Sequence, residues 1–255
     1  MDTLWQAFNS EDSWLPFLIP LMIWTGTLVY CNLPSKTPRP NWGDWLFVHE
    51  LHNFIIIIGW ISLYFDDDSI FNERIGILWS LSYFIVDFLY FMSKFDAPNT
   101  LHAALCLMLG FANYRIPLLR TLRMNSRAAQ CELSTPFLHV SRETRKPLHF
   151  VLFAIAFTLC RMLYIPVALI MPNRQRGMEW THWVMVALVA FYGLNYFWYI
   201  KILSHIDYVY RWKEEQQDQK GGIVGQSIWV HAERSKPPTN IRLAPLPATL
   251  VERPC

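Results

Sequence analysis

Six apolar segments, each about as long as a membrane-spanning helix, run through the sequence. They fall at residues 14–31, 45–65, 75–92, 101–117, 148–171 and 181–203. An α-helix needs about 20 mostly apolar residues to cross a bilayer. A seventh segment, at 122–140, is interrupted by Arg123, Arg127, Gln130 and Glu132. The sequence therefore predicts an all-α polytopic membrane protein, a bundle of about seven transmembrane helices, with six helices as the alternative.

The composition also favours a membrane protein. Hydrophobic residues make up 53% of the chain and charged residues only 16%, whereas soluble domains contain about 25% charged residues. The net charge of +2 gives no reason to expect nucleic acid as a partner. We therefore expect the bilayer and its lipids to be the partners. The five cysteines contain no CxxC pair and do not form a disulfide framework.

Three regions follow from the order of the segments. Residues 1–40 hold an N-terminal segment with the first transmembrane helix, residues 41–210 form a six-helix membrane domain, and residues 211–255 form a polar, Pro-rich C-terminal tail. The N-terminus is acidic and lacks a cleavage site of the secretory type, so we expect the first apolar run to remain as a helix. The tail loses apolar periodicity, which predicts disorder.

The distribution of basic residues favours an N-terminus on the outer side, because cytoplasmic loops carry an excess of Lys and Arg. With seven spans, this orientation places the following residues inside: Lys36, Arg39, Lys94, Arg142, Arg145, Lys146, Arg211 and Lys213. It leaves Arg115, Arg120, Arg123 and Arg127 outside. We expect these arginines to reach lipid phosphates, with a specific anion site as the alternative.

Among the ionisable residues inside the predicted spans, five are candidates for a functional role. A charge at mid-bilayer costs on the order of 2.5–3.5 kcal/mol, so such residues face protein or water and pair with one another. They are His52, Asp87, His102, Glu132 and Arg161. Because they come from five different spans, we expect them to converge and to line one polar cavity inside the bundle. The alternative for each is a purely structural hydrogen bond.

The stretch "ELSTPFLHV" combines a carboxylate with a proline four residues later. Pro136 has no N–H to donate to the carbonyl of Glu132, and its ring crowds that carbonyl. The spacing predicts a kink in the helix at Glu132. The freed carbonyl, the carboxylate and the hydroxyl of Ser134 would then lie at one depth, which a membrane tolerates only against protein or water.

Arg161 needs a partner because a guanidinium stays ionised even when it is buried. Glu132 and Asp87 are the candidate partners for an ion pair inside the cavity. Tyr164 and Pro166 repeat the pattern of a polar residue followed by a proline, so we include Tyr164 among the residues of the cavity.

Metal chemistry is not expected. The pair His49 and His52 has the spacing H-E-x-H, whereas the zinc motif H-E-x-x-H places its histidines four residues apart. The final span holds His182 near its start and His205 after its end, so ligands for a zinc site are lacking. We therefore expect neither a metal nor a cofactor.

Five stretches, taken in order, resemble the TLC domain, named after the TRAM, Lag1 and CLN8 proteins. They are "VHELHNFIIIIGWISLYF", "SYFIVDFLYFM", "LHAALCLMLG", "ELSTPFLHV" and "AIAFTLCRMLYIP", and the resemblance covers residues 41–205. It aligns His52 with the histidine of the family's first helix, Asp87 with the aspartate of its "YFIxD" motif, Glu132 with an acidic residue of its fifth helix, and Arg161 with an arginine of its sixth.

The chain resembles the small TLC domain-containing proteins more than the ceramide synthases. Ceramide synthases carry two adjacent histidines and paired aspartates, whereas here Leu101 precedes a single His102 and no second acid follows Glu132 within four residues. The resemblance implies an intracellular membrane, such as the endoplasmic reticulum.

Three functions are compatible with these residues. The first is a lipid-handling protein that acts in lipid homeostasis without catalysis and binds an amphiphilic lipid in a cavity formed by His52, Asp87, His102, Glu132, Ser134, Arg161 and Tyr164. The second is an N-acyltransferase with acyl-CoA as co-substrate, in which His102 takes the amine proton and Glu132 or Asp87 holds the imidazole. The third is a cargo or translocation accessory of the endoplasmic reticulum. We favour the first function.

Overall fold

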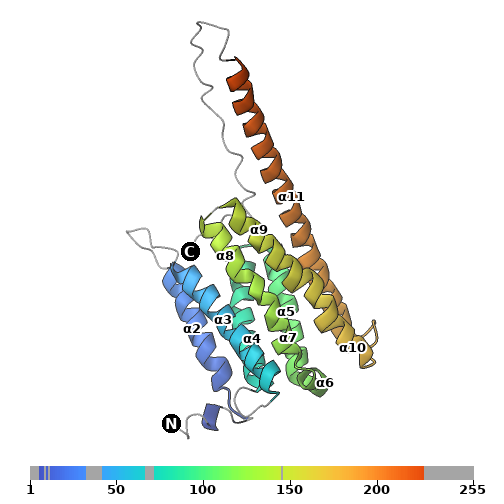
Figure 1. The fold of residues 1–255 in the computed structure, drawn as a ribbon. Coiled ribbons are helices and arrows are strands. Elements are labelled where there is room, and N and C mark those ends of the chain that lie inside the picture. Colours follow the sequence, from blue (N-terminus) through green and yellow to red (C-terminus); the bar gives the residue numbers. More distant parts are fainter. Residues whose placement is uncertain are drawn as a thin grey trace. The chain divides into compact units, whose positions relative to one another are not determined.

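The computed structural model describes residues 6–8, 10, 12–32, 42–66, 72–144 and 146–226, with side chains throughout except at 31–50 and 206–226. These residues are all-helical, with no strand among them, as predicted (Figure 1). The chain forms two compact units, Met1–Ile200 and Lys201–Pro254. Every tertiary contact discussed below lies within the first unit.

The helices follow the predicted apolar segments. In chain order the longer ones are α2 (Leu15–Asn32), α3 (Trp42–Phe65), α4 (Glu73–Ser93), α5 (Ala97–Arg115), α8 (Ser134–Thr144), α9 (Pro147–Phe157) and α11 (Trp183–Gln226). The shorter ones are α6 (Pro117–Thr121), α7 (Met124–Ala129), the 3-10 turn η1 (Gln130–Leu133), the π-helical segments η2 (Thr158–Leu163) and η3 (Ile165–Ile170), and α10 (Met171–Gln175).

Among the residues that the structure describes, three helices are long and apolar enough to cross a membrane, and they indicate a membrane protein. They are Glu73–Ser93, Pro147–Gln175, which joins α9 to α10, and Trp183–His205. Two further apolar helical segments, Leu15–Tyr30 and Leu51–Phe65, are shorter. The remaining predicted segments are helical as well, but their helices are too short or too polar to be counted with these three.

The segment predicted at 122–140 is a broken helix rather than a continuous one. It consists of α7, the 3-10 turn η1 and α8, so the backbone changes its winding at Glu132. The α-helix is thus interrupted at the predicted position, where Pro136 cannot donate the hydrogen bond that would continue it. α11 differs from the prediction in length: it continues to Gln226, through a run of the good helix formers Lys, Glu and Gln. The rest of the predicted tail, 227–255, lies outside the described residues.

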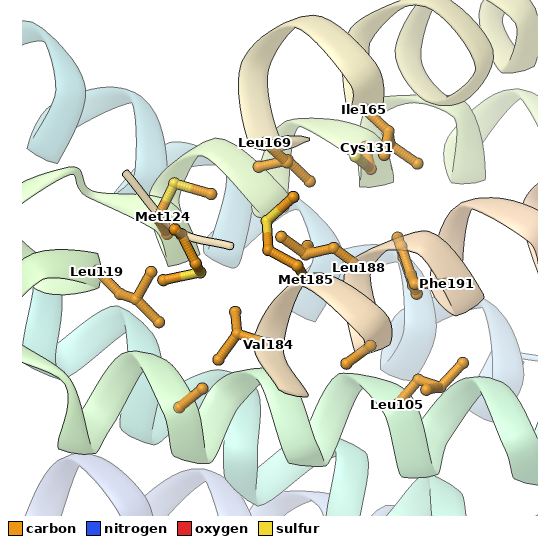
Figure 2. Packing of buried hydrophobic residues seen from close by; sticks show 13 residues of the cluster. Leu105, Leu119, Met124, Cys131, Ile165, Leu169, Val184, Met185, Leu188 and Phe191 are labelled. Atoms are coloured by element: carbon orange, nitrogen blue, oxygen red, sulfur yellow. The ribbon is translucent and has the colours of Figure 1, made fainter. Parts of the chain in front are cut away.

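Neighbouring helices pack side by side around two apolar clusters. α4 packs against α2 and α5, α3 packs against α7, and α8 packs against α9. One cluster joins α2, α3 and α4 through Trp24, Ile55 and Tyr83. The larger cluster joins α5, α6, α7, η3 and the first turns of α11 (Figure 2). These two clusters hold the helices around the polar residues described next.

The helices α3 and α7 approach one another closely at Gly59. A Cβ atom at this position would lie 2.9 Å from Gln130 Nε2 and 3.0 Å from the carbonyl oxygen of Ser126. Only a glycine leaves room for this contact, and the contact places the end of α3 beside the segment that carries Glu132.

Candidate functional site

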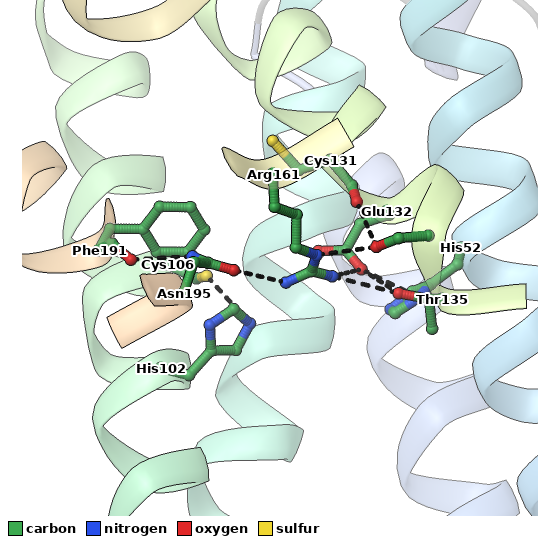
Figure 3. Close-up of polar contacts among 10 residues, drawn as sticks. His52, His102, Cys106, Cys131, Glu132, Thr135, Arg161, Phe191 and Asn195 are labelled. Atoms are coloured by element: carbon green, nitrogen blue, oxygen red, sulfur yellow. Dashed lines mark hydrogen bonds and ion pairs between the residues drawn. The ribbon is translucent and has the colours of Figure 1, made fainter. Parts of the chain in front are cut away.

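A buried polar network surrounds the guanidinium of Arg161 (Figure 3). Its Nε donates to Ser134 Oγ at 2.9 Å, its Nη1 to Asn195 Oδ1 at 3.2 Å, and its Nη2 to Glu132 Oε2 at 3.0 Å and Thr135 Oγ1 at 3.2 Å. All five residues are buried. The predicted ion pair of Arg161 is therefore present, and Glu132 is its partner.

The broken helices are what bring these groups together. Glu132 lies in the 3-10 turn η1, while Ser134 and Thr135 begin α8. Arg161 lies in the π-helical segment η2. This winding is rare in proteins as a whole, but where it occurs it is often at a functional site. Asn195 comes from α11, where its Nδ2 donates to the carbonyl of Phe191 at 2.8 Å. The amide oxygen of Asn195 is thereby directed to the guanidinium.

Glu132 also holds a histidine. Its Oε2 lies 3.4 Å from His52 Nδ1 and accepts a hydrogen bond from Thr135 Oγ1 at 2.7 Å. The imidazole of His52 meets the ring of Tyr83 edge to face at 5.2 Å between ring centroids. All these contacts use Oε2, and among the described residues no hydrogen bond to Glu132 Oε1 is found. One carboxylate oxygen therefore remains as an acceptor.

His102 lies beside the network, in aromatic surroundings. Its ring stacks on Phe191 at 5.5 Å and meets Trp198 at 5.3 Å and Phe84 at 6.0 Å, and its Nε2 is 3.7 Å from Cys106 Sγ. Within the described part of the chain, no hydrogen bond or ion pair joins His102 to Glu132 or Asp87. The described residues thus lack the contact that His102 would need as a base, because Glu132 lies beside His52 instead, and the role of His102 stays a prediction.

Two predicted site residues take no part in the contacts of Arg161. Asp87 is half-buried on α4, and Tyr164 packs its ring against the larger apolar cluster. Among the described residues, neither hydrogen-bonds to Arg161 or to Glu132. The network thus contains His52, Glu132, Ser134 and Arg161 from the predicted set.

An internal cavity of about 70 Å³ lies next to the network. A water molecule needs roughly 10–15 Å³ of such space, so the cavity has room for several waters or for a narrow stretch of alkyl chain. Its wall is mostly apolar, although the sequence predicted a polar lining. The polar residues of the wall are His52, Ser80, Asn113, Asn125, Glu132 and Asn173. Of the predicted set, only His52 and Glu132 line it.

A second buried carboxylate, Glu73, was not singled out by the sequence. Its Oε1 accepts from the backbone N–H groups of Asn125 at 2.8 Å and Ser126 at 3.2 Å, and its Oε2 accepts from Ser126 Oγ. Glu73 is the first residue of α4 and follows the N-cap Asn72, so from the sequence it belonged to a surface loop. Only the approach of α7 reveals its role, which is to fix the start of that helix.

The asparagines Asn113, Asn173 and Asn195 were missed for the same reason. Asn113 and Asn195 are neutral residues within apolar runs, and Asn173 belongs to the polar link that follows the span at 148–171. An uncharged amide gives no signal on a hydropathy scale comparable to that of a charge. The described residues contain no cluster of three or more His, Cys, Asp or Glu side chains that could hold a metal ion. Comparison with family models, with curated proteins and with solved structures finds no match to this chain.

Proposed function

We propose that this chain is a lipid-handling, multi-pass membrane protein of the TLC type, which binds an amphiphilic lipid in the cavity beside Arg161. The observation that carries the proposal is the buried network of Arg161, Glu132 and His52, two of whose members line the cavity. A buried ion pair does not by itself make a fold more stable than apolar residues would. Ionisable groups inside a membrane domain mark, by default, a binding or transport site.

The geometry suits a ligand with a polar head and an apolar chain. The free Oε1 of Glu132 is an acceptor for a hydroxyl or amine hydrogen, and the apolar wall receives the chain. Seven spans would place this site between helices, in an intracellular membrane such as the endoplasmic reticulum. Binding there would alter the composition or the distribution of membrane lipids without any change in covalent bonds.

Mass spectrometry of the lipids that co-purify with the full-length protein tests this function. Glu132→Gln and His52→Phe keep the size of each side chain and remove the charge or the ring nitrogens. We expect both variants to change which lipid is retained. Glu143→Gln is the matched control, since Glu143 is exposed on α8. An identical lipid profile in all four proteins, at equal amounts of folded protein, would contradict the proposal.

The pairing of Glu132 with His52 favours one second candidate, an N-acyltransferase. As the nitrogen of a lipid amine attacks the thioester carbonyl of acyl-CoA, His52 would take the amine proton and pass it to the sulfur. The C–S bond then breaks, an amide forms and CoA leaves as its thiol. Glu132 would hold the imidazole. Membranes supplied with labelled sphingoid base and acyl-CoA test this reaction: labelled amide that disappears in His52→Ala and persists in His102→Ala supports it, and the absence of product from wild type overturns it.

A further inference from the structure

The cavity has a second polar end, which the function proposed above does not use. Asn113 of α5, Asn125 of α7 and Asn173 of α10 line the cavity. Asn173 Nδ2 lies 3.7 Å from Met124 Sδ, next to Asn125. Each of these asparagines belongs to a different helix, so the three amides gather only through tertiary packing.

The asparagine end, defined as Asn113, Asn125 and Asn173, is about 10 Å from the network end. On α5, seven positions separate Asn113 from Cys106, and along α7 and η1 seven positions separate Asn125 from Glu132. A helix rises about 1.5 Å per residue, which gives roughly 10 Å for seven positions. Phe84 and Phe191, which contact His102 beside Cys106, mark the network end. The cavity is therefore elongated.

The amides at the asparagine end have unused hydrogen-bonding capacity. Asn173 is fully buried and its Nδ2 donates to the carbonyl of Leu169 at 2.8 Å, but its Oδ1 has no hydrogen-bond partner among the described residues. The buried side chains of Asn113 and Asn125 form no hydrogen bond within the same part of the chain. Buried amides are costly unless they are hydrogen-bonded, so this end is suited to a ligand that bonds them.

The charge of the wall restricts the chemistry of that ligand. The one carboxylate of the wall, Glu132, lies at the other end and is paired with Arg161. An asparagine side chain is neutral and both donates and accepts, so it matches an uncharged group that does the same, a hydroxyl or an amide. The apolar part of the wall includes Leu119, Met124 and Leu188 (Figure 2).

We propose that the asparagine end of the cavity binds the uncharged hydroxyl or amide group of a single-chain amphiphile, whose alkyl chain lies along the apolar wall. This inference rests on the proposed function and names the chemistry of the lipid. The volume of about 70 Å³ limits the enclosed part of this ligand to its polar group and a short stretch of chain, since a cavity of about 150 Å³ holds a molecule the size of benzene. A water molecule offers the same hydrogen bonds, and the experiment below separates the two occupants.

The test uses the full-length protein in phosphatidylcholine nanodiscs, with its Tm measured as 1-butanol is added. Butane and butyrate serve as probes that lack the hydroxyl or carry a charge. We expect 1-butanol to raise the Tm of wild type, because a ligand that binds the folded state stabilises it. Asn173→Leu and Asn113→Leu should weaken the apparent affinity by roughly tenfold each, the effect of one lost hydrogen bond. Ser82→Ala, a buried change away from the cavity, should respond like wild type.

Each outcome bears on one of the two proposals. Equal Tm shifts in wild type, Asn173→Leu and Asn113→Leu would overturn the asparagine site and leave lipid binding elsewhere in the cavity intact. If no alkyl probe shifts the wild-type Tm while Asn173→Leu lowers it, a water molecule occupies the site and the inference is wrong. The lipid profiles of Glu132→Gln and His52→Phe would then still decide the proposed function on their own.

Discussion

Arg161 joins three separate parts of the chain through its hydrogen bonds. From its own π-helical segment it bonds to the region of Glu132, Ser134 and Thr135 and to Asn195 of α11. Its guanidinium also lies 5.4 Å from the centroid of the Phe157 ring. Because the guanidinium is buried and always charged, it needs several hydrogen-bond acceptors, and four neighbouring side chains supply them.

Removing Arg161 alone should therefore destabilise the protein strongly. We expect Arg161→Met to lower the free energy of unfolding by about 3–5 kcal/mol, because it leaves the carboxylate of Glu132 buried without its cation. The double variant Arg161→Met with Glu132→Gln should recover most of that loss. Denaturation in mixed micelles measures both. Strictly additive effects of the two substitutions would show that the pair is not coupled.

At the scale of the helices, close backbone approach and proline determine the local geometry. Gly59 lets α3 and α7 touch. Pro166 is the second residue of η3, and the carbonyl of Met162, four residues earlier, accepts a hydrogen bond from the hydroxyl of Tyr192 at 3.3 Å. In a membrane, a neighbouring helix commonly satisfies a carbonyl that a proline has freed.

A side chain at Gly59 should separate α3 from α7. We expect Gly59→Ala to lower the free energy of unfolding by about 1–3 kcal/mol through overpacking. Gly26→Ala is the matched control, because nothing lies within 4 Å of a Cβ atom at Gly26 in α2, and there alanine should stabilise the helix by about 0.5–1 kcal/mol. The same loss in both variants would mean that helix contact is not the cause.

The hydrogen bond of Tyr192 should depend on Pro166. In wild type, Tyr192→Phe is expected to cost about 1 kcal/mol, the value of one hydrogen bond. In a Pro166→Ala background the new N–H is available to the helix, so the same change should cost much less. A double-mutant cycle of unfolding free energies measures the difference. An equal cost in both backgrounds would show that the hydroxyl does not replace a missing backbone bond.

At the scale of the whole molecule, three apolar helices indicate insertion in a membrane. Seven spans, which we propose, would place the N-terminus and the region after residue 205 on opposite faces, with the N-terminus outside. A glycosylation acceptor added at the N-terminus should then be modified in cells, whereas one added at the C-terminus should not. Modification of both sites would favour six spans, and modification of the C-terminal site alone would reverse the orientation.

The sequence by itself determined the class of protein, the positions of the helices and the break near Glu132. Apolar length and a proline act locally, through hydration of side chains and a missing N–H, so they can be read without knowledge of the fold. It also showed that Arg161 needs an anion, since a buried guanidinium does so in any fold.

Only the tertiary structure decided which groups meet. In the folded chain His52, rather than His102, lies beside Glu132. The carboxylate of Glu73 accepts hydrogen bonds from the start of α7. Three asparagines lie at one end of a mostly apolar cavity. These groups come from separate helices and are between 12 and 80 positions apart in the sequence. They depend on how helices rotate and approach one another, through contacts such as that of Gly59, and no local pattern in the chain encodes that geometry.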